Sequence, residues 1–256
     1  MASTSSKASV FRSIARSRRS SRRFQPNRKI PDAILGDILE STLRSPSSFN
    51  LQPSQIILVQ SNEMKQKLSK EAMLGPGNQF RTNDASALAV FLTDLEPTKR
   101  INRIYELEKN CRNPNYLNSL PMVSSFLIGE GHAATMIKGV ATNFLSVVQP
   151  MPVVEPVQAW GYKNSSLLAQ TFVYAAESND LATCMMEGFD SRRVQEILRI
   201  PDRYAVPLAV AIGYEYEDPE SFEHTPRLDV SEVVFSDTFG EPLRLEDDGE
   251  NADETA

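Results

Sequence analysis

Apolar residues recur at helical spacing in several stretches of the chain, which predicts helices with a buried side. These stretches cover residues 10–15, 31–43, 129–148, 165–178 and 190–198. The stretch from 129 to 148 mixes apolar with small residues, so we expect that helix to be buried. Asp190 is suited to begin the last helix, because an aspartate side chain accepts hydrogen bonds from the first N–H groups of a helix.

Shorter apolar runs have the length of buried strands and fall well below the ~20 residues that span a bilayer. They cover residues 56–59, 85–93, 182–188, 204–214 and 233–235. The run that begins at 182 ends at Glu187-Gly188, where backbone N–H groups are open to a ligand that comes close. The sequence therefore predicts helices and strands mixed along one chain.

Loops with many Ser, Asn, Gly and Pro residues separate these elements. We predict loops at residues 45–53 and 74–81 and a proline-rich connector at 150–156. From Pro97 to Asn118 the chain is polar, has few apolar anchors and is interrupted at Pro114. We expect an exposed excursion there, of the kind that can cover a site. Trp160 is interpreted as a packing residue.

The composition is that of a globular protein long enough to form one large domain or two small ones. The 256 residues are 41% hydrophobic and 23% charged, with a net charge of -6. Cys111 and Cys184 are too few for a disulfide framework, and His132 and His224 have no ligand-spaced neighbours. We therefore expect no metal site, and a reducing compartment is the simplest setting.

The segment from Arg16 to Phe24 concentrates arginines and serines and contains no acid; we call it the arginine segment. Guanidinium groups match phosphate oxygens two at a time, and serine hydroxyls add neutral donors. The segment thus favours binding of a phosphate ester. Its composition also fits an organelle transit peptide, a basic tail that touches nucleic acid, or a solvated run of charge.

Taken together, these motifs resemble the FMN-dependent nitroreductase family, from the helix before Arg18 to Pro242. The arginine segment looks like the family's phosphate-binding signature. The loop at 45–53 is similar to the loop that a partner subunit lends to the flavin. The segment 187–190 resembles the one beside the flavin N5 atom, and Arg227 stands at a late basic position that returns to the phosphate.

The resemblance implies a set of FMN-binding residues and no metal ligand. They are Arg18, Arg19, Ser20, Arg22, Pro46, Ser47, Ser48, Asn50, Asn78, Arg81, Met185, Met186, Glu187, Gly188 and Arg227. Arg18, Arg19, Ser20 and Arg227 would neutralise the phosphate. Arg22 and Arg81 would stabilise negative charge on the reduced ring, because a fixed cation favours the form in which charge develops. The backbone at Glu187 and Gly188 would hold N5, and no side chain need act as a catalytic acid.

The implied fold is α+β and nitroreductase-like, with three layers, a central mostly antiparallel sheet flanked by helices, and an intertwined homodimer. The implied reaction is a ping-pong transfer of electrons from NADH or NADPH, through FMN, to a nitroaromatic, quinone or similar small acceptor. The expected partners are a second copy of the chain and that acceptor, without nucleic acid or membrane. The same scaffold also serves reductive dehalogenation and flavin fragmentation, and FMN binding without turnover stays open.

We predict a flexible basic N-terminus at residues 1–9, the FMN-binding domain at 10–245 and a disordered acidic tail at 246–256. Ser54 departs from many relatives, which carry an aromatic residue after the Gln-Pro pair. We expect a cytoplasmic protein. Mitochondrial targeting is the alternative, but cleavage within the arginine segment would remove the phosphate motif.

Overall fold

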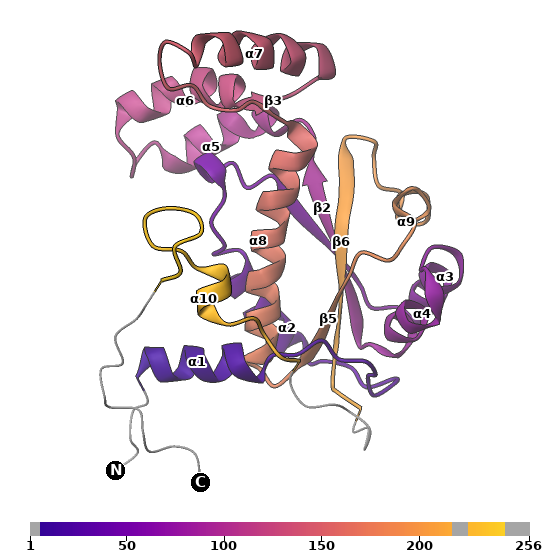
Figure 1. Ribbon diagram of the computed structural model, residues 1–256. Helices are drawn as coiled ribbons and strands as arrows, with labels where there is room; N and C mark the ends of the chain where they lie inside the picture. Colours follow the sequence, from indigo (N-terminus) through magenta and orange to yellow (C-terminus); the bar gives the residue numbers. More distant parts are fainter. Residues whose placement is uncertain (1–5, 217–224, 244–256) are drawn as a thin grey trace. The chain divides into compact units, whose positions relative to one another are not determined.

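A computed structural model of the chain describes residues 6–216 and 225–243 (Figure 1). The chain divides into two compact units, residues 1–221 and 222–256, which are described separately. The first unit carries the sheet and almost all of the helices that the structure describes. The predicted acidic tail at 246–256 lies outside the described residues.

A four-stranded antiparallel sheet forms the centre of the first unit, in the order β1-β2-β6-β5. The strands are β1 (Ser54–Val59), β2 (Ala87–Asp94), β5 (Ala182–Met186) and β6 (Tyr204–Gly213). Every residue of β2 is buried, as its continuous apolar run predicts. The four strands predicted in this unit are confirmed, and β1 and β5 form the two edges of the sheet.

Helices α2 (Asp32–Thr42) and α8 (Val157–Glu177) cover one face of the sheet. Phe172 of α8 packs edge to face on Phe91 of β2, with ring centroids 5.8 Å apart. The helix α8 begins eight residues before the predicted start at Ser165. Its first turns bury small and polar residues such as Gly161 and Asn164, which hid the helical pattern in the sequence. Trp160 is buried, as predicted.

Helices α3 (Asn62–Glu71), α4 (Gly75–Asp84) and α9 (Ser191–Leu198) lie on the other face. Helix α3, which our pattern did not identify, is capped by Ser61. The prediction of a loop at 74–81 is wrong: Pro76 occupies the first turn of α4, where its missing N–H costs nothing. The cap of α9 is confirmed, since Asp190 accepts from the backbone N–H groups of Arg192 and Arg193 at 3.0 and 3.2 Å.

A buried lysine closes the end of α4. Lys65 is 2% exposed, and its Nζ donates to the carbonyl oxygens of Asn83 and Ala85. Burial lowers the pKa of Lys65, and the nearby carboxylate of Asp84 acts in the opposite direction. A cation at this position stabilises the carbonyl groups that a helix leaves without partners at its C-terminus.

The excursion between β2 and α8 is mostly helical. It contains η2 (Pro97–Arg100), α5 (Ile101–Glu108), α6 (Pro114–Leu127), β3 (Ile128–Gly129), α7 (His132–Leu145) and β4 (Glu155–Pro156). The sequence indicated a break at Pro114, but this proline begins α6 for the same reason that Pro76 fits α4. Ile101 and Ile104 anchor α5 by burial, so the excursion is less polar than expected.

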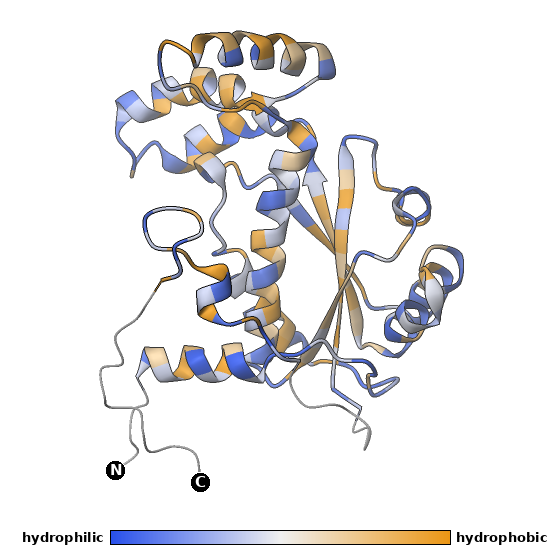
Figure 2. Cartoon of the chain, viewed as in Figure 1, coloured by the Kyte–Doolittle hydropathy of each residue, from blue (hydrophilic) through white to orange (hydrophobic). Residues whose placement is uncertain are grey.

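Helix α7 is exposed, which contradicts the prediction of a buried helix at 129–148. Met136, Val140 and Phe144 are 73%, 70% and 79% exposed, and Figure 2 shows the helix as largely hydrophobic. Its contact with the chain runs instead through Lys138, whose Nζ donates to carbonyls at the end of α6, and through the buried Thr142. Periodicity revealed an apolar stripe but could not show that the opposite side of the helix makes the contact.

The second unit contains α10 (Val230–Val233), which begins with a capping box formed by Asp229 and Glu232. The strand predicted at 233–235 is therefore only partly correct: Val233 ends this helix, while Phe235 forms an isolated bridge with Pro242. Within the described ranges, no helix is long and apolar enough to cross a membrane, and no cluster of His, Cys, Asp or Glu could hold a metal ion. Both cysteines are free thiols.

Candidate functional site

The arginine segment leaves helix α1 (Lys7–Ser17) and runs beside the edge strand β5. Phe11 of α1 packs edge to face on Tyr174 of α8, with ring centroids 5.6 Å apart. Ser20 forms a parallel bridge with Thr183, and the N–H of Ser21 donates to the Thr183 carbonyl at 2.9 Å. Of the predicted phosphate-binding residues, Arg18, Arg19 and Ser20 therefore lie next to β5, the strand that leads to Glu187 and Gly188.

Two of the arginines are paired with acids that lie far away in the sequence. Arg19 forms an ion pair with Glu215, and Arg23 lies 3.5 Å from a carboxylate oxygen of Asp84. The segment has no acid of its own, but the fold supplies these two. The backbone N–H of Arg18 donates to the Ile14 carbonyl at 3.2 Å, but its side chain has no hydrogen bond or ion pair with any residue in the described part of the chain. Its guanidinium group is therefore available to a ligand.

Helix α4 connects to the end of β5 through the side chain of Asn78. Its Nδ2 donates to the carbonyl oxygens of Gly188 and Leu74, both at 3.1 Å, and its Oδ1 accepts from Nη1 of Arg81 at 3.2 Å. A Cβ atom added at Gly188 would lie 2.3 Å from Nδ2 of Asn78. Only glycine allows this close approach.

Arg81 places a positively charged side chain with an unsatisfied donor next to Asn78 and Gly188. Its Nε is buried and has no hydrogen-bond partner among the residues that the structure describes. Burial raises the pKa of the nearby Cys184 thiol, and the charge of Arg81 acts against that increase. A buried donor without a partner is costly in a folded protein, so it marks a position where an acceptor is expected to bind.

These features define the β5-side group. Its members are Arg18, Arg19, Ser20, Arg22, Asn78, Arg81, Met185, Met186, Glu187 and Gly188. The side chain of Met185 is 40% exposed, whereas that of Met186 is 3% exposed and packs in the core. Only the backbone of Met186 is therefore suited to contact a ligand. Segments around residues 20, 80 and 187 thus meet at the β5 edge of the sheet, next to α4.

The other predicted residues, Pro46, Ser47, Ser48 and Asn50, form the β1-side group, in the loop between α2 and β1 that contains η1 (Ser48–Asn50). The N–H of Ser48 donates to Asn164 of α8 at 2.9 Å, and Nδ2 of Asn50 donates to Glu108 of α5 at 2.7 Å. The loop is thus held from outside by two helices.

The backbone of this loop is unusual. Phe49, Asn50 and Gln52 have φ angles of 56°, 52° and 47°, a left-handed conformation that residues other than glycine rarely adopt. Such a conformation persists only where the surroundings fix it. Here Oγ of Ser47 accepts from the N–H of Gln52 at 3.0 Å, and Arg100 donates to the Gln52 carbonyl at 2.6 Å.

One chain does not bring the two groups together. The β1-side group precedes one edge strand and packs on α8, while the β5-side group adjoins the opposite edge strand and α4. The sheet lies between the helices that support them. Arg227 belongs to the second unit, where its Nη1 donates to Oγ1 of Thr225 at 2.7 Å and to the Pro226 carbonyl at 3.1 Å. Its role at the phosphate stays a prediction.

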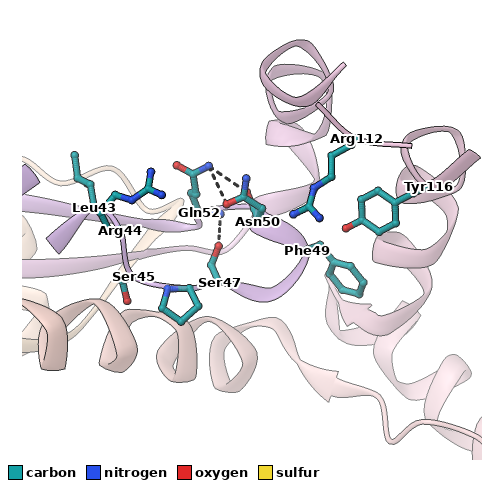
Figure 3. Close-up of a pocket in the computed structure, with 10 residues that line it drawn as sticks. Leu43, Arg44, Ser45, Ser47, Phe49, Asn50, Gln52, Arg112 and Tyr116 are labelled. Carbon is teal, nitrogen blue, oxygen red and sulfur yellow. Dashed lines mark hydrogen bonds between the residues drawn. The ribbon is translucent and has the colours of Figure 1, made fainter. Parts of the chain in front are cut away.

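Beside the β1-side group lies a cavity of about 520 Å³ (Figure 3). It is lined by Leu43, Arg44, Ser45, Pro46, Ser47, Phe49, Asn50, Gln52, Arg112 and Tyr116. Sequence reasoning did not identify Arg44, Arg112 or Tyr116 as site residues. Glu108 and Arg112 stand four positions apart, the spacing at which charged side chains on one helix meet. This spacing was the only sequence signal that could have pointed to Arg112.

Comparison with known proteins identifies the family. The model of the nitroreductase family matches residues 15–214. The chain belongs to this family. A protein named NADH dehydrogenase from Thermus thermophilus is 30% identical over 207 residues, which cover 81% of this chain and 87% of that protein. The predicted family is confirmed, and with it the predicted class of enzyme, an oxidoreductase that depends on FMN.

Solved structures show that the fold is shared. The Bacillus subtilis protein YdfN superposes with a TM-score of 0.70 at 23% identity, covering 90% of this chain and 99% of that one. A protein from Exiguobacterium sibiricum, whose crystal structure is a complex with FMN, gives a TM-score of 0.64 at 20% identity and covers 88% and 95%. The predicted nitroreductase fold is thereby confirmed.

The residues of the β5-side group fit FMN. The cofactor has an anionic phosphate and a polar ring edge. The group offers the guanidinium of Arg18 and the buried Nε of Arg81, neither of which has a partner within the described ranges, and a backbone at Gly188 where a larger side chain would meet Asn78. Arg18 is thus suited to the anionic phosphate, and Arg81 and the backbone at Gly188 are suited to the polar ring edge.

Proposed function

We propose that the protein is a homodimeric FMN-dependent oxidoreductase that takes electrons from NADH or NADPH and passes them, in a ping-pong sequence, to a nitroaromatic, quinone or similar small acceptor. The observation that carries this proposal is the convergence of Arg18, Arg81 and Gly188 in the β5-side group. When bound there, FMN supplies the redox chemistry, and the protein supplies binding, orientation and charge.

Each part of the β5-side group has a role in this proposal. Arg18 and Ser20 hold the phosphate, with Arg19 sharing its charge between the phosphate and Glu215. Arg81 places a positive charge beside the ring edge where negative charge develops, which stabilises the charged form. The Gly188 carbonyl is already bonded to Leu74 and Asn78. We therefore assign the backbone N–H groups of Glu187 and Gly188 to the ring nitrogen at which reduction occurs.

The proposed dimer follows from the separation of the two groups. Within one chain the β1-side group lies across the sheet from the β5-side group, although the resemblance places both at the flavin. A second copy resolves this, because each subunit lends its β1-side loop to the β5-side group of the other. In a symmetric dimer this exchange builds two identical sites. The loop's rigid backbone suits it to serve as a preformed wall.

The decisive experiment is to purify the protein without added flavin, record its visible spectrum and titrate it anaerobically with NADH and then NADPH. A yellow protein with about one FMN per subunit, bleached by either nucleotide, is the expected result for one site per subunit. Screening nitroaromatics, quinones and halogenated aromatics against the reduced protein then identifies the acceptor and separates reduction from dehalogenation. A colourless protein that does not bind added FMN would refute the proposal. Light scattering should report a dimer.

A further inference from the structure

Among the described residues, two arginines and no acid line the cavity beside the β1-side group. The side chain of Arg44, two residues after the end of α2, has no hydrogen bond or ion pair with any residue in the described ranges. Arg112 follows α5, and its side chain is 53% exposed. Figure 3 shows the two guanidinium groups extending toward Asn50 and Gln52 from opposite ends of the cavity. The lining thus presents positive charge from two separate elements.

Glu108 holds Arg112 in place without closing the cavity. Its Oε1 accepts from Asn50 at 2.7 Å, and its Oε2 lies 3.6 Å from Nε of Arg112. Oε2 is buried and makes no hydrogen bond with the described residues. The guanidinium of Arg112 also lies 5.7 Å from the centre of the Tyr116 ring. The ion pair uses Nε of Arg112, so its terminal nitrogens can still donate hydrogen bonds to an anionic ligand.

The remaining lining suits the rest of a small aromatic compound. Phe49 and Tyr116 offer ring faces, and the amide groups of Asn50 and Gln52, which are hydrogen-bonded to each other at 3.3 Å, form a polar wall. A volume of about 520 Å³ lies within the range of cavities that bind small molecules. Each guanidinium group can bind a carboxylate or a phosphate through paired hydrogen bonds, which a neutral ligand cannot match.

We propose that this cavity, here called the Arg44–Arg112 pocket, binds the anionic group of an aromatic or heteroaromatic substrate. This inference rests on the proposed function, because the β1-side loop that forms one wall is the segment proposed to meet the partner's flavin. The anionic group is a carboxylate on the electron acceptor or the 2′-phosphate that distinguishes NADPH from NADH. Both sources share the chemistry that two arginines recognise.

The test measures binding to the purified holoenzyme by titration calorimetry, with two pairs of probes that differ in one anionic group. The first pair is 4-nitrobenzoate and 4-nitrobenzamide, and the second is NADP⁺ and NAD⁺. In Arg44→Gln and Arg112→Gln, we expect the dissociation constant of the charged probe to rise about tenfold, as when a charge-assisted hydrogen bond is lost. The neutral probe of the affected pair should change less than about twofold, because it never used the arginine.

Arg103→Gln is the matched control, since Arg103 lies exposed on α5 and does not line the pocket. Loss of discrimination within the first pair assigns the pocket to an acceptor carboxylate, and loss within the second pair assigns it to the 2′-phosphate. The inference is overturned if neither pair responds, or if the charged and neutral probes weaken equally. The proposed function fails separately, by a colourless protein or a flavin that neither nucleotide bleaches.

Discussion

The β5-side and β1-side groups are built in opposite ways. The β5-side group gathers three distant segments, and two of its donors, the guanidinium of Arg18 and Nε of Arg81, have no partner among the residues that the structure describes. In the β1-side group, the polar groups of Ser47, Ser48 and Asn50 are bonded to the subunit's own residues, and the backbone is held in a left-handed conformation. The β5-side group can therefore bind a ligand directly, whereas the β1-side group presents a surface whose polar groups are already hydrogen-bonded. We infer that the chain carries two complementary halves of a site.

The largest expected effect concerns the ion pairs behind the β1-side loop. Asp94 is fully buried and accepts from Arg203 through both oxygens at 2.7 Å and from Arg100 at 3.0 Å, while Arg100 also holds the Gln52 carbonyl. Asp94→Asn should lower the free energy of unfolding by about 3 kcal/mol, because it removes the buried anion that both arginines share and leaves Arg203 only its partly exposed pair with Glu96. Urea titration measures this. Glu106→Gln, which disrupts an exposed pair with Lys109, should leave stability unchanged.

The same residue predicts a dependence on pH. Burial alone would raise the pKa of Asp94, but hydrogen bonds from Arg203, the Glu96 backbone and Arg100 outweigh it and hold the pKa below its usual 3.8. The contribution of Asp94 is therefore present above pH 3.8 and is lost as the pH falls toward the folded-state pKa. The stability difference between wild type and Asp94→Asn should shrink below that pH. A difference that stays constant would contradict the pairing.

The next prediction disrupts the β5-side group alone. Gly188→Val should displace the amide of Asn78 and raise the dissociation constant of FMN roughly 10- to 100-fold, since two hydrogen bonds of Asn78 are lost. The free energy of unfolding should fall less than in Asp94→Asn, because the side chain of Asn78 can rotate away from the added methyl groups. Fluorescence titration with FMN measures the effect. Gly36→Ala in α2 is the control, because an added Cβ meets nothing within 4 Å there. It should leave FMN binding unchanged.

Mixing variants tests whether the two groups meet across a dimer. Gly188→Val impairs the β5-side group and Asn50→Ala the β1-side group, so each pure variant should lose most activity. After co-refolding in equal amounts, half of the dimers are mixed, and each mixed dimer has one intact site. We therefore expect about a quarter of the wild-type activity to return. If both groups served the site of their own chain, mixed dimers would contain no intact site and no activity would return.

A smaller effect is expected from the arginine segment. Arg18→Ala should raise the dissociation constant of FMN about tenfold, the cost of one charge-assisted hydrogen bond to phosphate. Arg16→Ala, two residues earlier and at the exposed end of α1, should have no effect. Riboflavin provides a further check, because it lacks the phosphate and should bind wild type and Arg18→Ala equally. Equal loss of riboflavin binding would place Arg18 elsewhere.

The smallest effect is expected at Arg19. Its ion pair with Glu215 is partly exposed, with side chains 45% and 30% accessible, so Arg19→Ala should lower stability by at most about 1 kcal/mol. FMN affinity should fall less than in Arg18→Ala, because the acid already takes part of the charge. Glu215→Gln should then strengthen FMN binding slightly. Paired titrations of the two variants measure both changes.

The sequence identifies the fold's centre and most of its candidate residues because these depend on local signals. Continuous apolar runs gave β2 and β6, and the run of arginines marked the β5-side group. Relations between distant positions were not accessible to such signals: Arg19 pairs with Glu215, Asn78 bonds to Gly188, and Arg44 and Arg112 line one cavity. The exposed side of α7 was missed for a related reason. A stripe of apolar residues shows that a helix has two sides but does not show which one the rest of the chain covers.

The composition of the excursion between β2 and α8 predicts how binding of the protein to chromatography resins changes with salt. From Asn113 to Val154 the only Asp, Glu, Lys or Arg residues are Glu130 and Lys138. Both are engaged internally, Glu130 with Thr98 and Lys138 with the end of α6. Salting-out ions strengthen apolar contacts and screen charged ones. Ammonium sulfate should therefore increase retention of the protein on a phenyl resin through α7, while it weakens retention on a phosphocellulose resin through the arginine segment.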